Sequence, residues 1–565
     1  MQGIGVSPGI SIGKAYVLRQ QKEVASGVVL SDGAAVLQEI AQYREAVKLS
    51  VEEVQELFNK VVEEERDILE VQLELLQDPQ LESDVLARIG SDKMTARDAV
   101  LVVIGLAMQL FEQMEDEYLK ARAADVQDAG NRIVRHLSGN AGSAAGTGLK
   151  ADTGLSASIL HSGAGDDAPL IIIAEDLSPS DTIGMDRSKV LGFATQSGGK
   201  TSHVAIVARL RGLPAVVGCG GELDGIVDGD LVVLDGSHGL VLVNPTPAIV
   251  EEYRKKQEIF RQEIQRLQDL KDRPAVTTDG VRIELLANIA TAEDMDQALA
   301  FGAEGVGLLR TEMLFMERDS FPTEDEQVRY YKTILLRAGN RMVTIRTLDI
   351  GGDKPLPYFE LPKEDNPFLG YRAIRICLDR KDLFLTQLRA ILRASVFGNC
   401  RIMLPMISGV QEVRQARSCL EEAKEELLRS GVAFDTTIKM GIMIEVPSAA
   451  VIADLLAKEA DFFSIGTNDL CQYVLAADRM NKQIKDLYDP YHPAVLRLIR
   501  YVIEQGHLQG IPVGMCGELA GDPQATSLLL GMGLREFSMN APAIPAIKDI
   551  LLRSSETAAR KNFQL

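Results

Sequence analysis

Eight short β-like segments recur in the second half of the chain, and this repetition constrains the fold more than any other feature of the sequence. From about Ala275 to the end, these segments alternate with helical patterns over nearly 290 residues. They read RIELLANIA, GVGLLRTE, RMVTIRTLDIGG, CRIMLPMIS, KMGIMIEVPS, DFFSIGTNDL, IPVGMCGELAG and REFSMN. Eight βα units of this size predict a (β/α)8 barrel of the TIM type, and an open doubly wound sheet is the alternative.

Polar and charged residues cluster where these predicted strands end. In a (β/α)8 barrel, the functional residues lie at the carboxyl ends of the strands and in the loops that follow. In the order of the strands, the residues are Arg310 (second), Arg346 (third), Glu445 (fifth), Asn468 and Asp469 (sixth) and Cys516 (seventh). Arg372 and Arg479 fall in the connections after the third and sixth strands. A buried salt-bridge network is the alternative for any one of them, whereas their recurrence at strand ends favours a site.

These residue types predict a small anionic ligand and a metal ion. Guanidinium groups bind phosphate and carboxylate bidentately, so several arginines at one mouth suit a small di- or trianion that carries both. Glu445 and Asp469 offer hard oxygen ligands without His or Cys, which suits Mg²⁺ held by carboxylates and substrate oxygens. Cys516, between glycines in GMCGELAG, is either a small buried apolar residue or a proton donor, because a thiol is largely protonated at neutral pH.

The first half of the chain has a different pattern. A β-like start, GIGVSPGISIGKAYVL, precedes a region from about Asp32 to Leu137 with heptad-like apolar spacing and almost no Gly or Pro, which predicts a helical bundle. Within it, residues 61–86 carry nine acidic side chains and one basic side chain, Arg66. Taken alone, this acidic stretch favours a solvated helix face, and a docking surface is the alternative.

A small α/β domain is predicted after the bundle. A Gly-, Ala- and Ser-rich segment without a phosphate-loop pattern leads into it and is interpreted as a flexible connection. The short β-like runs of this domain are LIIIAEDLSPSD, VLGFATQSGG, LPAVVG and DLVVLDG. A half-exposed linker helix is predicted next, with Thr246 as its cap and Pro247 at its first position.

One of the chain's six histidines stands at the start of a predicted helix in this domain. GGKTSH supplies two glycines and the cap candidates Thr201 and Ser202, and VAIVARLRG then continues as a short helix that ends at Gly212. Backbone N–H groups and the helix dipole stabilise an anion in the first turn, so a phosphoryl group on His203 is favoured there. Taken alone, the pattern favours a histidine that merely caps or packs.

Composition limits the classes of protein and the compartment. No apolar run is long enough to span a bilayer, and the start MQGIGVSPGIS lacks the pattern of a secretory signal. The six cysteines show no metal-binding spacing, which fits a reducing compartment, so we expect a cytoplasmic protein. A formal charge of −21 disfavours nucleic acid and anionic lipid as partners and favours a basic protein.

Long motifs in both halves resemble the enzymes that use phosphoenolpyruvate. GGKTSHVAIVARLRGLPAVVG resembles the phosphohistidine segment shared by Enzyme I of the bacterial sugar phosphotransferase system, pyruvate phosphate dikinase and phosphoenolpyruvate synthase. The segments that resemble their phosphoenolpyruvate-binding barrel are GVGLLRTEMLFM, IRTLDIGGDKPLPY, FLGYRAIR, GIMIEVPSAA, FFSIGTNDLCQYVLAADR and GMCGELAGD. GIGVSPGISIGKA and YLKARAADVQDAGNRIVRHL resemble Enzyme I in particular, and the likeness spans nearly the whole chain.

The resemblance to Enzyme I implies phosphoenolpyruvate-protein phosphotransferase activity. A phosphoryl group would pass from phosphoenolpyruvate to Nε2 of His203, with Mg²⁺ bound, and then to a histidine of the small phosphocarrier HPr, as the first step of sugar uptake. The residues that match substrate-binding positions are Arg310, Arg346, Asn468, Asp469 and Arg479. Glu445 and Asp469 match the metal ligands, and Cys516 matches the acid that protonates the enolate. Lys354 and Arg372 also match, with no role assigned.

The same resemblance implies a domain plan. Residues 1–30 and 141–246 would form the α/β phosphohistidine domain, 31–140 an inserted helical HPr-binding subdomain, 247–272 the linker helix, and 273–565 the barrel that binds phosphoenolpyruvate and forms a homodimer. The acidic stretch then favours docking. Two features depart from the family pattern: Gln72 stands where a histidine is expected, and the Gly-rich segment at 141–168 is longer than usual.

Two other functions compete with this interpretation. A dikinase or phosphoenolpyruvate synthase needs an ATP-binding domain of some hundreds of residues, and fewer than 200 precede the His203 segment. A regulatory phosphorelay protein with a degenerate barrel predicts the loss of metal or substrate residues, and none of the matched residues is lost. Because the histidine and the barrel site lie in separate domains, we predict a swivel about the linker helix.

Overall fold

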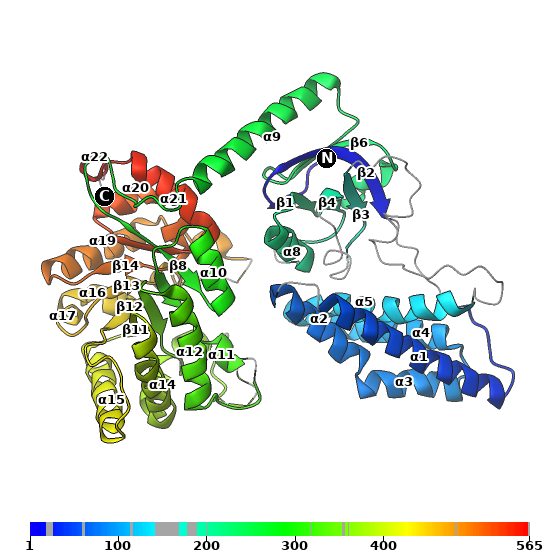
Figure 1. Cartoon of the computed structure of the whole chain (residues 1–565), viewed down its shortest axis with the longest axis horizontal. Helices are drawn as coiled ribbons and strands as arrows, with labels where there is room; N and C mark the ends of the chain where they lie inside the picture. Colours follow the sequence, from blue (N-terminus) through cyan, green and yellow to red (C-terminus); the bar gives the residue numbers. More distant parts are fainter. Residues whose placement is uncertain are drawn as a thin grey trace. The chain divides into compact units, whose positions relative to one another are not determined.

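Two units make up the chain, residues 1–263 and 264–565 (Figure 1). The computed structural model describes residues 1–18, 26–58, 63–112, 117–141, 169–177, 189–199, 202–316, 318–352, 356, 358–359, 361–479, 481 and 483–562. The Gly-rich segment, from residue 142 to 168, therefore lies outside the described residues, as does Lys354.

The second unit is a closed barrel of eight strands. They are β8 (Glu284–Ile289), β9 (Val306–Leu309), β10 (Val343–Arg346), β11 (Cys400–Leu404), β12 (Met440–Ile444), β13 (Phe463–Ile465), β14 (Val513–Met515) and β15 (Glu536–Met539). Neighbours around the barrel follow the chain order and pair in parallel, and β15 closes the ring on β8. All eight predicted strands are confirmed, and this closing pair excludes the open sheet.

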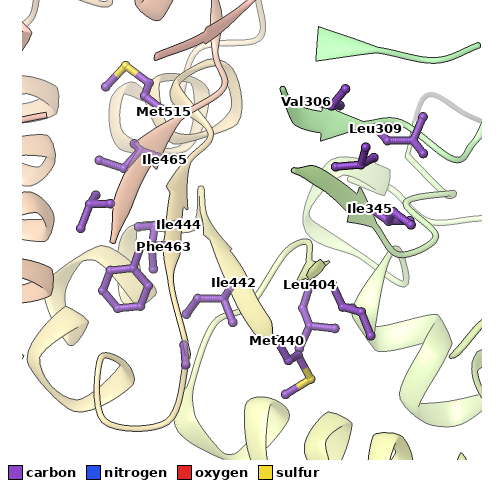
Figure 2. Packing of buried hydrophobic residues seen from close by; sticks show 14 of the residues in the cluster. Val306, Leu309, Ile345, Leu404, Met440, Ile442, Ile444, Phe463, Ile465 and Met515 are labelled. Atoms are coloured by element: carbon purple, nitrogen blue, oxygen red, sulfur yellow. The ribbon is translucent and has the colours of Figure 1, made fainter. Parts of the chain in front are cut away.

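The barrel strands bury both of their faces, which explains their continuous apolar sequences. Ile442 and Ile444 of β12 pack in the main core between strands and helices (Figure 2), whereas Met443 between them belongs to a separate cluster with Leu308 and Cys516. Alternation along one strand therefore separates the outer core from the barrel interior. Helices between the strands include α10 (Ala292–Ala300), α12 (Glu324–Ala338), α14 (Lys381–Ala394), α15 (Val410–Arg429), α19 (Pro493–Leu508) and α20 (Pro523–Met532).

The first unit contains a seven-stranded mixed sheet. Its strands are β1 (Ile4–Ser7), β2 (Ile10–Leu18), β3 (Leu170–Ala174), β4 (Val190–Thr195), β5 (Ala215–Val217), β6 (Leu231–Asp235) and β7 (Leu240–Val243). Their order in the sheet is β1-β5-β4-β3-β2-β6-β7. The sequence patterns predicted these strands except β7, which forms an antiparallel hairpin with β6 across a turn that contains Gly239 at a φ of 68°.

Helix α8 (His203–Arg211) connects β4 to β5, which are parallel neighbours in this sheet. Its apolar residues Val204, Ala205 and Ala208 pack in the core on one face of the sheet. The predicted cap and end are confirmed: the Ser202 hydroxyl accepts a hydrogen bond from the Ala205 N–H, and Gly212 ends the helix with a φ of 59°. His203 is thus the first residue of the helix, as predicted.

The described residues between β2 and β3 form a bundle that includes five helices. The helices are α1 (Gly33–Phe58), α2 (Glu63–Leu76), α3 (Pro79–Ser91), α4 (Ala96–Glu112) and α5 (Glu117–Ala141). Their apolar faces share one core, and this confirms the helical region predicted from the heptad-like spacing. Helix α9 (Pro247–Gln268) follows the sheet and begins at Pro247, as predicted, and the division between the two units falls within it. Among the described helices, none has both the length and the apolar character needed to cross a bilayer.

Candidate active site

The carboxyl ends of the barrel strands carry the predicted site residues. Arg310 directly follows β9, Arg346 is the last residue of β10, Glu445 directly follows β12, and Cys516 directly follows β14. Asn468 and Asp469 differ from the prediction, because β13 ends at Ile465 and both residues lie in the first turn of α18 (Thr467–Leu475). Parallel strands in a barrel have their carboxyl ends on one face, so these side chains share one mouth.

Arg346 is buried between carboxylates at the base of this mouth. Its Nη2 forms ion pairs with Glu312 and with Oδ2 of Asp349, the latter at 3.0 Å. Burial opposes its charge, but Glu312 and Asp349 outweigh burial and raise the pKa of Arg346. Its Nε–H is buried and has no acceptor among the described residues. Arg346 is therefore a fixed cation that retains one donor for a ligand oxygen.

Arg372 shares a counter-ion with Arg346. Its Nη2 lies 3.1 Å from Oδ1 of Asp349 and 3.6 Å from Oδ2 of Asp469, and its Nε–H also has no acceptor in the described part of the chain. Gly351, at a φ of 92°, permits this arrangement, because a Cβ there would lie 2.8 Å from Cβ of Arg372. One carboxylate, Asp349, thus holds two buried arginines in fixed orientations.

Arg310 and Arg479 add further positive charge. Burial in the mouth and the positive charge of Arg346 lower the pKa of Arg310, and Arg479 acts in the same direction. The described residues offer no carboxylate within ion-pair distance of Arg310 or Arg479. An anionic substrate would therefore relieve repulsion among these arginines.

Glu445 and Asp469 form a pair of carboxylates that fits a divalent cation. Burial first, and then the charges of Asp469 and Asp349, raise the pKa of Glu445 to about 8. The Met406 N–H donates to Oε1 of Glu445 at 2.6 Å, which fixes the carboxylate. No group of three or more His, Cys, Asp or Glu side chains suited to a metal occurs in the described part of the chain. The oxygen donors and their mutual repulsion fit a hard divalent cation whose coordination is completed by substrate oxygens and water.

Asn468 lies beside these carboxylates and contacts the loop after β14. Its Nδ2 donates to Oε1 of Glu518 at 3.3 Å, and its Oδ1 accepts from the Glu518 N–H at 3.1 Å. The approach of this loop requires Gly517, since a Cβ there would lie 1.8 Å from Oγ1 of Thr467. Asn468 therefore ties the start of α18 to the segment that contains Cys516.

Cys516 is buried and remains protonated at neutral pH. Burial raises the pKa of its thiol, while Ser464, Arg346 and Arg310 partly oppose the increase. Its Sγ lies 3.8 Å from the carbonyl oxygen of Ile465, and Asn288 donates to the carbonyl oxygen of Cys516 at 2.9 Å. A fixed, protonated thiol among arginines is suited to donate a proton to a substrate carbanion.

His203 belongs to the first unit, whereas the other predicted site residues belong to the second. It follows β4 through a loop in which Gly198 has a φ of 105°, and the Ser202 hydroxyl donates to the Gly199 carbonyl at 2.9 Å. A strand, a glycine loop and a helix amino terminus together form a site that stabilises an anion.

Sequence analysis missed Asp349 and Glu312, the two buried carboxylates that orient the arginines. Each lies three residues beyond the end of a barrel strand, Asp349 in DIGGDK and Glu312 in LLRTE. Their acidic character next to a strand-end arginine was the available signal. Arg372, which had no assigned role, belongs to the same network.

Comparisons with known proteins match this architecture. Residues 264–556 match the PEP-binding domain of the PEP-utilising enzymes, residues 2–122 match their N-terminal domain, and residues 167–239 match their mobile domain. Among solved structures, the chain is similar over part of its length to an Enzyme I protein (nEIt) determined by NMR in solution. That protein is 38% identical, covers 46% of this chain and 99% of its own, and gives a TM-score of 0.37.

Named relatives are similar over almost the whole chain. The phosphoenolpyruvate-protein phosphotransferase of Bacillus sp. (strain S) is 46% identical and covers 99% of this chain and 94% of its own length. The enzyme of the same name from Bacillus subtilis (strain 168) is 45% identical, over 99% of this chain and 95% of its own length, and that from Haemophilus influenzae is 44% identical, over 98% and 93%. Together with the barrel and its mouth, this similarity means that the chain belongs to the phosphoenolpyruvate-protein phosphotransferases, the transferases of the first step of the phosphotransferase system.

Proposed function

We propose that His203 accepts the phosphoryl group of phosphoenolpyruvate at the barrel mouth and passes it to a histidine of the phosphocarrier HPr. The observation that carries this proposal is the set of charges at the mouth. The charges of Arg310 and Arg346 act to lower the pKa of the Cys516 thiol. The buried Nε–H groups of Arg346 and Arg372 have no acceptor among the described residues. Phosphoenolpyruvate offers a phosphate, a carboxylate and a carbon that must be protonated, which these groups match.

Groups of this chain supply both the nucleophile and the proton that the phosphoryl transfer requires. Nε2 of His203 attacks phosphorus, a P–N bond forms, and the bond between phosphorus and the enol oxygen breaks. Arg310, Arg346, Arg372, Asn468 and Arg479 hold the phosphate and carboxylate oxygens, because phosphoryl transfer depends on alignment and neutralised charge. The Cys516 thiol protonates the methylene carbon of the enolate to give pyruvate, and the thiolate regains its proton from water.

Mg²⁺ held by Glu445 and Asp469 would neutralise charge on the phosphate when bound. This assignment rests on the hard oxygen donors and on the raised pKa of Glu445 beside Asp469. Its measurable consequence is the loss of His203 labelling in excess chelator, with recovery on addition of Mg²⁺.

The inserted bundle is proposed as the HPr-docking surface. Glu74, Glu82 and Asp84 are exposed on α2 and α3, and they fit a basic partner. Gln72 is buried instead, and its amide donates to the carboxylate of Asp128 while Arg132 donates to its Oε1 at 3.4 Å. Gln72 would therefore influence docking through the bundle core and not by direct contact with the carrier.

The two sites require motion and assembly. His203 must reach the barrel mouth and then leave to meet its carrier, so we infer a swivel about α9. We also infer a homodimer through the barrel. Exposed Leu455 and Leu508, from α17 (Ala453–Leu456) and the end of α19, support it, since these two helices pack side by side. A Leu455→Glu variant should sediment as a monomer at concentrations where the parent chain dimerises. The six cysteines, all free and buried, support a cytoplasmic location.

The decisive experiment uses phosphoenolpyruvate labelled in its phosphoryl group, with Mg²⁺ and without ATP. We expect an acid-labile, base-stable label on the intact chain, none on His203→Ala, and discharge of the label when HPr is added. His238→Ala is the matched control, because His238 is an exposed histidine of the same unit and should not affect labelling. Absence of label on the parent chain with metal present would refute the proposal.

A further inference from the structure

A second recess opens at the opposite end of the barrel from the catalytic mouth. It has a volume of about 690 Å³ and lies at the amino ends of β8, β9 and β10, beside the segment that follows α9. We call it the basal cavity. All of its lining residues belong to the second unit, between Lys271 and Met342. A cavity of this size falls within the range of small-molecule sites and exceeds the size of a single phosphate ion.

The basal cavity is lined by four basic side chains. Arg282 pairs with Glu304, and Nη1 of Arg341 donates to the carbonyl oxygen of Ala338 at 3.4 Å. Lys271 and Arg273 form no ion pair with any of the described residues. The ammonium group of Lys271, the guanidinium group of Arg273 and the remaining N–H donors of Arg341 are therefore available to a ligand.

A buried lysine adds to this charge from beneath. Lys548, from α21 (Ile544–Arg553), is 1% exposed, and its Nζ donates to the carbonyl oxygens of Lys271 at 2.6 Å and Gly302 at 3.4 Å. The lining has four basic residues against the three acidic residues Asp272, Glu284 and Glu304, and Lys548 adds positive charge behind the lining. This local excess of positive charge, in a chain with a net charge of −21, favours an anion.

The wall that carries the free cations is fixed in place. Gly302 has a φ of 83°, and a Cβ there would lie 2.6 Å from the carbonyl oxygen of Lys271. Any other residue would push the segment after α9 away from the loop between α10 and β9. The glycine contact and the Lys548 hydrogen bonds thus hold this backbone before any ligand arrives, which lowers the entropic cost of binding.

We propose that the basal cavity binds a small phosphate monoester dianion, held by Lys271, Arg273 and Arg341. Guanidinium groups grip phosphate oxygens in pairs, and the ammonium group adds a third contact. The free volume beyond the phosphate receives the organic part of the ester. This site is separate from the proposed transfer from phosphoenolpyruvate to His203.

Isothermal titration of the full chain with glycerol 3-phosphate tests the proposal. This probe carries the phosphate dianion but lacks the carboxylate that the catalytic arginines also require. We expect one saturable site, at least about tenfold weaker binding in the Lys271→Ala/Arg273→Ala double variant, and unchanged binding in Arg310→Ala. Lys458→Ala is the matched control, because Lys458 is an exposed barrel lysine outside the cavity.

Four results would overturn the proposal. They are the absence of saturable binding up to about 10 mM probe, a span that covers weak small-molecule sites; equal binding by the double variant; loss of binding in Arg310→Ala, which would place the phosphate in the catalytic mouth; and tight binding of succinate without binding of glycerol 3-phosphate, which would make this a carboxylate site.

Discussion

The amino end of α8 and the mouth of the barrel are built in different ways. At α8, the described residues include a hydroxyl cap, Ser202, and a loop glycine, Gly198, with a positive φ. At the mouth, Asp349 alone joins two buried arginines, and Glu445 is held by a backbone N–H. Under the proposed function, a helix amino end supports the phosphoryl group carried on His203, whereas a network of buried side chains holds a substrate with two anionic ends.

The largest effect in the mouth is expected from Cys516→Ala. Pyruvate formation should fall by about 10²- to 10⁴-fold, with little change in phosphoenolpyruvate affinity, because the variant lacks the proton donor. Burial raises the pKa of this thiol, and only the protonated form donates, so the parent rate should decline only above the usual thiol pKa. Pyruvate assays across pH measure both effects. Cys419→Ala, a buried cysteine of α15, is the control, and an unaltered alkaline limb in Cys516→Ala would contradict the assignment.

Asp349→Asn tests how strongly substrate turnover and stability depend on one buried carboxylate of the mouth. Breaking a buried ion pair costs about 3–5 kcal/mol, so kcat/KM for phosphoenolpyruvate should fall by about 10²-fold and the urea midpoint should decrease. Asp382→Asn provides the contrast, since its carboxylate pairs with Arg380 at 2.8 Å on the surface and should contribute at most about 1 kcal/mol. Equal effects of the two substitutions would contradict a role for Asp349 in the site.

Gly351→Ala separates backbone strain from steric contact. Gly351 and Gly339 both have positive φ, but only a Cβ at Gly351 would collide with Arg372, while Gly339 faces open space. We expect Gly351→Ala to be less stable than Gly339→Ala by about 1–3 kcal/mol, and to bind phosphoenolpyruvate more weakly. Denaturant unfolding and substrate titration measure the difference, and matching values for both variants would show that contact with Arg372 is unimportant.

The smallest effect is expected at the amino end of α8. Ser202→Ala removes the cap of α8 and should cost about 1 kcal/mol of stability, while phosphoenolpyruvate binding at the mouth remains unchanged. His203 labelling should slow only a few-fold, as rapid-quench kinetics with labelled substrate would show. Thr323→Ala, which removes the cap of α12, should lose similar stability without slower labelling. A large loss of labelling in Ser202→Ala would mean that phosphoryl transfer depends on the geometry of the α8 amino end as strongly as on that of the mouth.

Sequence reasoning reached the parts of the molecule that repeat or end an element. The barrel strands follow from their apolar runs, and Arg310, Arg346, Glu445 and Cys516 follow from their place at strand ends. Asp349 was beyond reach, because its role depends on bringing together Arg346 and Arg372, 26 residues apart in the chain. The environment of Gln72 was also beyond reach, since periodicity did not reveal that this amide is fully buried.

The pairing of β2 has a consequence for how the chain is made. This strand bonds to β3, at residues 170–174, and to β6, at residues 231–235, so both of its partners emerge long after it. At about 5–20 residues per second, the ribosome needs roughly 10–40 s to supply the last of them. During that interval the inserted bundle, which has an apolar core of its own, is completed, whereas β2 has two unpaired edges. Newly made chains are therefore most exposed to aggregation before the sheet closes, and slower synthesis would prolong that exposure.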